Sequence, residues 1–104
     1  MKIVTWNVNS VRARLERLVE VLRRHEPDVL CLQETKTTDD RFPREVLAEV
    51  GYHCVTAGQK TYNGTALLSR EPAQDLVRGF PGNPIPEQAR VISGTFGDVR
   101  VVCV

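Results

Sequence analysis

The chain has 104 residues, 41% of them hydrophobic and 26% charged, proportions typical of one globular domain. The formal net charge of +1 provides no overall attraction for an anionic partner, so any nucleic-acid site must be built from local basic residues. No signal peptide is recognisable, and no apolar run approaches the about 20 residues of a membrane helix, which argues against a membrane partner.

The beginning of the chain predicts a strand–helix–strand unit. Residues 2–6 form a β-rich run, and from position 11 to 25 apolar residues recur at helical spacing. Asn9 or Ser10 is suited to cap this helix, and residues 29–32 form a second, fully apolar strand. Because the connecting helix is long, we expect the two strands to be parallel and the crossover to be right-handed.

The rest of the chain predicts mostly β-structure. We expect a short helix at 43–50 and strands at 52–57, 65–69, 75–80, 89–96 and 99–104. Gly97 and Asp98 are typical of the turn of a hairpin, whereas the stretch FPGNPIPE is expected to be irregular and exposed. From the residues alone, the fold class is α/β with a mixed sheet, parallel in its first pairing and antiparallel later.

Three cysteines are present, at positions 31, 54 and 103. Their odd number, wide spacing and lack of a Cys-x-x-Cys pair argue against a disulfide framework or a thiolate zinc site. Each lies in an apolar, strand-like run, so we interpret them as buried free thiols. Free thiols indicate a reducing compartment, and we therefore expect a cytoplasmic protein.

Polar residues follow the first two predicted strands. Asn7 comes after the first strand and Glu34 after the second. If these strands are parallel neighbours, about 4.8 Å apart, both side chains lie at the edge of the sheet where α/β proteins bind ligands. An amide oxygen and a carboxylate suit a hard cation, Mg²⁺ first and Mn²⁺ next. Turn chemistry for Asn7 and a solvated strand end for Glu34 are the alternative.

Basic residues flank these positions. Arg12, Lys36, Lys60 and Arg90 are placed to contact a phosphate backbone beside the metal, and residues 62–64 (Tyr62, Asn63 and Gly64) add an aromatic side chain and a glycine. Taken singly, each cation is better explained as a solvated surface charge, and Tyr62 as an anchor of its loop.

Four segments, IVTWNVNSVRARL, PDVLCLQETK, YNGTALLSR and ARVI, occur in an order that resembles the exonuclease III family of abasic-site endonucleases. That family is part of the metal-dependent endonuclease, exonuclease and phosphatase superfamily. The resemblance covers essentially the whole chain. The basic segment after the first motif and the QETK sequence point to the DNA-repair branch, because a lone QE pair would carry little weight.

The resemblance implies a four-layer α/β sandwich and cleavage of double-stranded DNA at abasic sites and from 3′ ends. It implies that Asn7 and Glu34 belong to a magnesium site, that Glu34 is catalytic and that Asn9 lies near the metal. Positions close to DNA are, by the same resemblance, Arg12, Lys36, Tyr62, Asn63, Gly64 and Arg90. Thr65 departs from the apolar residue usual after Asn-Gly in the family.

Family members are more than twice as long as this chain, so residues 1–104 are expected to be the N-terminal part of one domain. The later tyrosine, aspartate, asparagine and histidine residues of the family have no match here. We therefore expect the full-length protein, a monomer, to be active and this part alone to be inactive. A non-catalytic nucleic-acid-binding fragment and a phosphatase or phosphodiesterase of the same superfamily remain alternatives.

Overall fold

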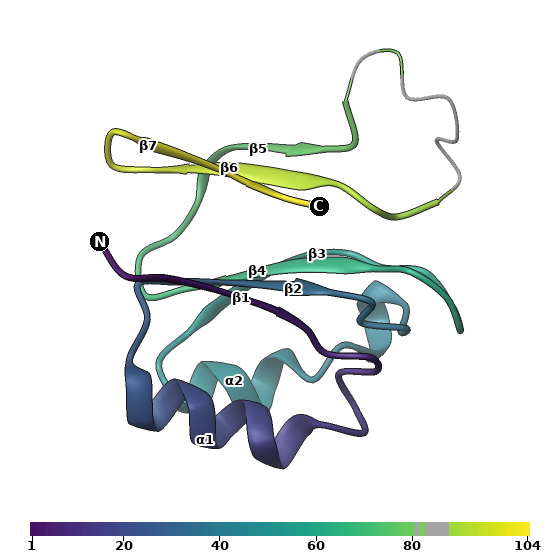
Figure 1. Ribbon diagram of the computed structural model, residues 1–104, viewed down its shortest axis with the longest axis horizontal. Coiled ribbons are helices and arrows are strands. Elements are labelled where there is room, and N and C mark those ends of the chain that lie inside the picture. Colours follow the sequence, from purple (N-terminus) through teal and green to yellow (C-terminus); the bar gives the residue numbers. More distant parts are fainter. Residues whose placement is uncertain (81, 83–87) are drawn as a thin grey trace.

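The computed structural model describes residues 1–80, 82 and 88–104, and arranges them in three layers (Figure 1). Two helices lie against one face of a four-stranded sheet, and a three-stranded sheet lies over its other face. The elements in chain order are β1 (Ile3–Asn7), α1 (Leu15–His25), β2 (Val29–Gln33), the 3₁₀ turn η1 (Asp39–Arg41), α2 (Arg44–Glu49), β3 (His53–Ala57), β4 (Thr65–Ser69), β5 (Gln74–Arg78), β6 (Ile92–Phe96) and β7 (Val99–Cys103).

The predicted strand–helix–strand unit is confirmed. Strands β1 and β2 are parallel neighbours, with Ile3 opposite Val29 and Asn7 opposite Gln33. The other pairings of the four-stranded sheet are antiparallel and give the order β1-β2-β4-β3. The mixed sheet expected from the sequence is therefore present.

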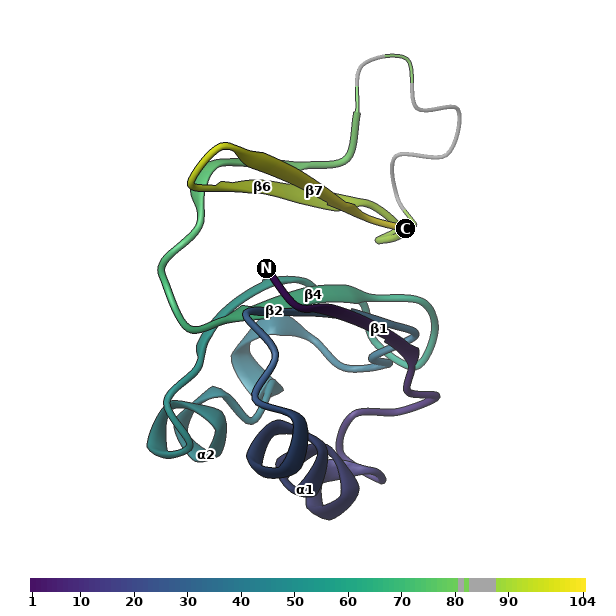
Figure 2. The ribbon, with the colours of Figure 1, turned by 60° about the vertical axis from the view of Figure 1, so that its left-hand side comes forward.

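The last three strands do not join the mixed sheet but form a second, antiparallel sheet in the order β5-β6-β7, a division that the residues alone did not predict. Strand β4 already pairs with β2 on one side and β3 on the other, so no edge of it remains for β5. The chain therefore crosses to a new layer. The second sheet agrees with the sandwich implied by the resemblance, but the described residues place no helix on its outer face (Figure 2). The irregular stretch predicted at 80–87 falls, except for residues 80 and 82, outside the described residues.

Alternating side chains bury both faces of the four-stranded sheet. Leu30 and Leu32 of β2 join the cluster that packs against the helices, whereas Val29 and Cys31 join the cluster between the two sheets. A strand covered on both sides reads as an unbroken apolar run, which explains the sequence VLCL. Each fully buried leucine contributes about 1.5–3 kcal/mol to stability, so both layers are needed to hold β2 in place.

Helix α1 begins at Leu15, later than the predicted Val11. Asn9 and Ser10 do not cap it, since both adopt left-handed backbone angles, with φ of 47° and 86°. The N–H of Val11 instead donates to the carbonyl of Thr35 at 3.0 Å, which continues the contact between the ends of β1 and β2. Residues 11–14 form turns instead of helix, and the Arg14 N–H donates to the carbonyl of Ser10 at 3.3 Å. No helix in the described part has the length and apolar character to cross a bilayer.

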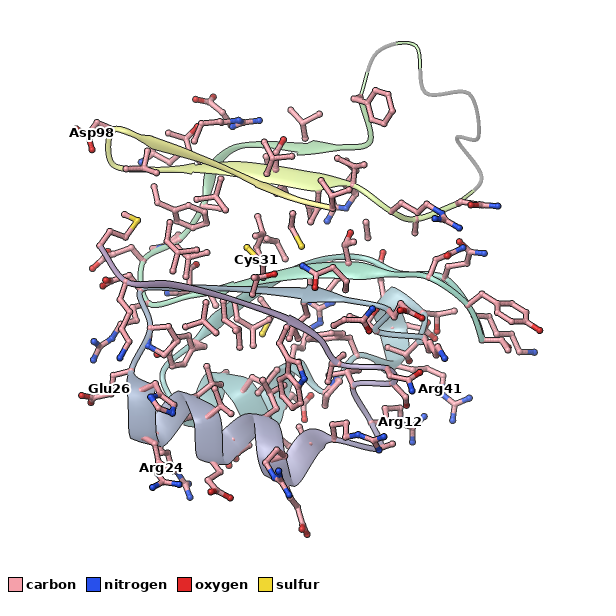
Figure 3. All side chains as sticks on the ribbon, viewed as in Figure 1. Arg12, Arg24, Glu26, Cys31, Arg41 and Asp98 are labelled. Carbon is pink, nitrogen blue, oxygen red and sulfur yellow. The ribbon has the colours of Figure 1, made fainter. Side chains whose placement is uncertain are left out.

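All three cysteines are free thiols, as expected. Cys31 points into the space between the two sheets (Figure 3), and Cys103 is buried in the same cluster. A hydrogen bond with Cys103, together with burial, raises the pKa of Cys31.

The half-buried Cys54 provides a test of this packing. Burial raises the pKa of its thiol from 9.0 to about 11. We expect iodoacetamide at pH 8 to modify Cys54 of the native protein roughly 100-fold more slowly than an exposed thiol, because far less thiolate is present. Mass spectrometry of native and urea-unfolded protein measures this difference, and Cys54→Ser identifies the modified residue. Equal rates in the two states would contradict the burial.

Candidate metal and nucleic-acid site

The candidate site lies where β1 and β2 end. Backbone pairing continues past both strands, because the N–H of Val8 donates to the carbonyl of Gln33 at 3.0 Å and the N–H of Ser10 donates to the carbonyl of Glu34 at 2.9 Å. The parallel register therefore carries the residues that follow the two strands to the same edge of the sheet. This is the edge at which the sequence placed a cation site.

Asn7 and Glu34 are in contact, as their positions after parallel strands predicted. The Asn7 amide nitrogen donates a short hydrogen bond to Glu34 Oε2, and the Asn9 N–H donates to Asn7 Oδ1 at 3.3 Å. Asn9 thus lies beside the pair, held through its backbone. The two side chains that were singled out at the ends of β1 and β2 therefore lie side by side.

The turn that carries Glu34 has an unusual backbone. Glu34 and Lys36 both have left-handed angles, with φ of 52° and 55°, and Asn63 on the facing loop has a φ of 57°. Such angles are uncommon for residues other than glycine and are often found at functional sites. Hydrogen bonds hold the turn, because the Thr35 N–H donates to the carbonyl of Gly64 at 3.1 Å and the Lys36 N–H donates to the carbonyl of Asn63 at 2.9 Å.

Lys36 supplies the positive charge nearest to the acidic group. Its Nζ donates to Asn9 Oδ1 at 2.5 Å and lies 4.0 Å from Glu34 Oε1. The side chains of Lys36 and Glu34 keep exposures of 31% and 45%, so both can exchange these contacts for a ligand. An anion that approaches Glu34 therefore meets a partly compensated charge rather than a bare carboxylate.

A surface depression of about 280 Å³ brings together five of the residues singled out in the sequence. Its lining consists of Asn7, Glu34, Asn63, Gly64, Thr65, Ala89, Arg90 and Val104. Arg90 is exposed, and its Nε donates to Gln88 Oε1 at 2.5 Å. The depression thus combines a carboxylate, amide groups and a guanidinium, which are the groups needed to bind a cation and a phosphate together.

The structure separates the other basic and aromatic candidates from this depression. Arg12 lies in the turn before α1, not in its first helical turn as predicted, and lines another depression with Asp40 and Arg41 on the helical side of the molecule (Figure 3). Tyr62 is 67% exposed on the outer loop. Lys60 is exposed on the same loop. These side chains reach only a ligand much larger than the depression itself.

Two residues of the site were not predicted from the sequence. Gln59 Oε1 accepts hydrogen bonds from the Ala89 N–H at 2.9 Å and from Asn63 Nδ2 at 3.3 Å, so it fastens the 59–64 loop to the segment that carries Arg90. Thr65 contributes to the wall of the depression. A polar residue in a loop and a threonine at a strand start are too common to have revealed these positions.

The chemistry of the donor set determines which cation the site suits. Across the described ranges, no three His, Cys, Asp or Glu residues come together, which leaves one carboxylate and one amide as the protein ligands. Such a set is too small for a zinc site and suits Mg²⁺ or Mn²⁺, which retain water ligands. Asn7 now turns its amide nitrogen toward Glu34, so it must rotate to present its oxygen. With that rotation the residues fit the ion.

Comparison with known families identifies the class of protein. The model of the Endonuclease/Exonuclease/phosphatase family matches residues 4–102, so the chain belongs to this family. Relatives that it matches include an exodeoxyribonuclease III and an AP endonuclease, in agreement with the resemblance seen in the sequence.

Three of these relatives show how far the similarity extends. Exodeoxyribonuclease III of Haemophilus influenzae is 39% identical over 92 residues, which are 88% of this chain and 34% of the relative. A solved 3′-5′ exonuclease from Neisseria meningitidis has a TM-score of 0.94 and 49% identity, over 98% of this chain and 40% of that one. An AP endonuclease from Archaeoglobus fulgidus has a TM-score of 0.92 and 37% identity, over 98% of this chain and 39% of that one. The chain thus spans well under half the length of these proteins.

Proposed function

We propose that residues 1–104 form the N-terminal part of a divalent-metal-dependent DNA-repair nuclease. The full-length protein would cleave the backbone of double-stranded DNA at abasic sites and remove nucleotides from 3′ ends. The observation that carries this proposal is the contact between Asn7 and Glu34 in a depression that also holds Arg90. The relatives described above, which are exonucleases and an AP endonuclease, support it.

Each residue has a defined task in this proposal. The Glu34 carboxylate and the Asn7 oxygen would hold the cation, which when bound supplies stabilisation of the charge that develops on the phosphoryl oxygens. Arg90, which lines the depression, would bind a phosphate oxygen by charge-assisted hydrogen bonds. Lys36 would give up its hydrogen bond to Asn9 and contact the same DNA strand. Tyr62 and Arg12, which lie away from the depression, would contact more distant parts of the duplex.

The same geometry supports the inactivity expected for the 104-residue chain. Hydrolysis requires a group that takes a proton from the attacking water. Among the described residues that line the depression, Glu34 has the one acidic side chain, and the cation would occupy it. We therefore propose that the general base belongs to the longer protein, which acts as a monomer in the cytoplasm.

Metal removal tests the proposal. We expect the full-length protein to nick a duplex with one abasic site, to lose this activity in excess EDTA and to regain it with Mg²⁺ or Mn²⁺. Gel separation of a labelled strand measures the product, and residues 1–104 alone should give none. Nicking that persists in EDTA, or nicking by the 104-residue chain, would contradict the proposal.

Removal of a 3′-terminal phosphate is a second candidate activity. A solved relative with 49% identity is described as a 3′ phosphatase from Neisseria bound to product DNA hairpin. Parallel assays with an abasic duplex and with a duplex that ends in a 3′-phosphate would rank the two activities by kcat/KM. Because both use the same cation site, EDTA should abolish both.

A further inference from the structure

Thr65 has an unsatisfied polar group at the candidate site. It is 2% exposed, and its hydroxyl is, within the part of the chain that the structure describes, the single buried side-chain oxygen or nitrogen without a hydrogen-bond partner. A buried hydroxyl that lacks a partner pays the full cost of losing its water. Native proteins pair almost all such groups, so this one calls for an explanation.

The position of Thr65 indicates where its partner lies. Thr65 opens β4 and pairs with Gln33 of β2, the residue that precedes Glu34. Two positions further along the same face of the strand, Leu67 packs between the two sheets. Thr65 therefore faces the space between the sheets, at the end where it contributes to the depression with Asn7 and Glu34.

We propose that the Thr65 hydroxyl hydrogen-bonds a water molecule in the hydration shell of the cation held by Asn7 and Glu34. This inference rests on the proposed function, because it requires a cation at that pair. Two protein oxygens leave most positions around Mg²⁺ or Mn²⁺ to water, and those waters need hydrogen-bond acceptors. A threonine hydroxyl accepts such a bond and can donate its own proton to a second oxygen. Thr65 is thus a positioning residue that orients the hydrated ion.

The substitution Thr65→Val, made in the full-length protein, tests this role. Valine keeps the shape of threonine and removes the hydroxyl. Without metal, we expect the variant to unfold at the same or a higher temperature than the wild type, because it loses an unpaired polar group. Its dissociation constant for Mn²⁺, measured by electron paramagnetic resonance, should rise roughly five-fold, the effect of one hydrogen bond. Thr65→Ser, which keeps the hydroxyl, should restore the affinity.

Thr56→Val is the matched control. Thr56 is 3% exposed on the neighbouring strand β3, but its hydroxyl donates to Asp39 Oδ1 at 2.6 Å. Removal of a satisfied hydroxyl should lower the unfolding temperature with or without metal and leave the Mn²⁺ affinity unchanged.

The outcomes separate this inference from the proposed function. If the wild type does not bind Mn²⁺, or if Glu34→Gln binds it equally well, the cation site itself is wrong. If binding depends on Glu34 but Thr65→Val binds Mn²⁺ as the wild type does, only the role of Thr65 is overturned. A lower unfolding temperature of metal-free Thr65→Val would also overturn it, because the hydroxyl would then have a partner within the protein.

Discussion

Glu34→Gln is expected to lower kcat/KM for DNA cleavage by roughly 100-fold or more, the largest effect of any single substitution at the site. Glutamine keeps the size of the side chain and one oxygen, so the contact with Asn7 can persist. It removes the only negatively charged side chain among the described residues that line the depression. A cation that loses its charged ligand gives up several kcal/mol of binding and charge stabilisation, and about 1.4 kcal/mol corresponds to each factor of ten.

Glu26→Gln provides a closely matched control. Glu26 has a left-handed φ of 44°, near the 52° of Glu34. It also lies 4.0 Å from a cation, in this case Arg70. It follows the last turn of α1, at the end of the helix opposite to Arg12 (Figure 3), and it does not line the depression. Loss of a carboxylate charge at Glu26, a residue with a similar backbone conformation, should therefore leave kcat/KM for DNA cleavage unchanged.

The magnesium dependence of the rate distinguishes a ligand from a structural residue. If Glu34 holds the ion, the concentration of Mg²⁺ that gives half-maximal activity should rise in Glu34→Gln, while far-ultraviolet circular dichroism stays the same. Wild-type activity and wild-type magnesium dependence in this variant would remove the basis for the cation site.

The pairing of Asn7 with Glu34 was predictable from the sequence because it depends on few physical steps. An amphipathic helix between two apolar runs implies parallel strands, and parallel strands bring the residues after them to one edge. The unbroken apolar run VLCL of β2 is likewise the pattern of a strand covered on both faces. These inferences rest on period and connection length, which are local properties of the sequence.

Other parts of the fold depend on how segments that are distant in the sequence pair and pack. Residues 11–14 continue the helical pattern of the sequence, yet they form turns after the left-handed Ser10, so α1 starts at Leu15 and Arg12 lies in a turn. The second sheet arises because both edges of β4 are already paired. The roles of Gln59 and Thr65 appear only when loop and strand are placed together. No local pattern in the sequence predicts these long-range pairings.

Gly64 lies where the 59–64 loop approaches the turn that follows Glu34. Its backbone has a φ of 92°, and its amide donates to the carbonyl of Ala89 at 2.7 Å. An added Cβ would overlap Thr35 Oγ1 and come within 3.4 Å of the backbone nitrogen of Lys36. Thr35 is 1% exposed and has no room to move away. The close approach of this loop to the turn after Glu34 therefore requires glycine.

Gly64→Ala should accordingly lower the free energy of unfolding by about 3–4 kcal/mol, the sum of left-handed strain and overpacking. Gly51→Ala is the control, because Gly51 has a similar φ of 99° with nothing within 4 Å of an added Cβ. That variant should lose only about 1–2 kcal/mol from strain. Urea unfolding of the full-length protein measures both, and only Gly64→Ala should also weaken Mn²⁺ binding, because it displaces the turn that holds Glu34. Equal losses in the two variants would show that the loop does not press on this turn.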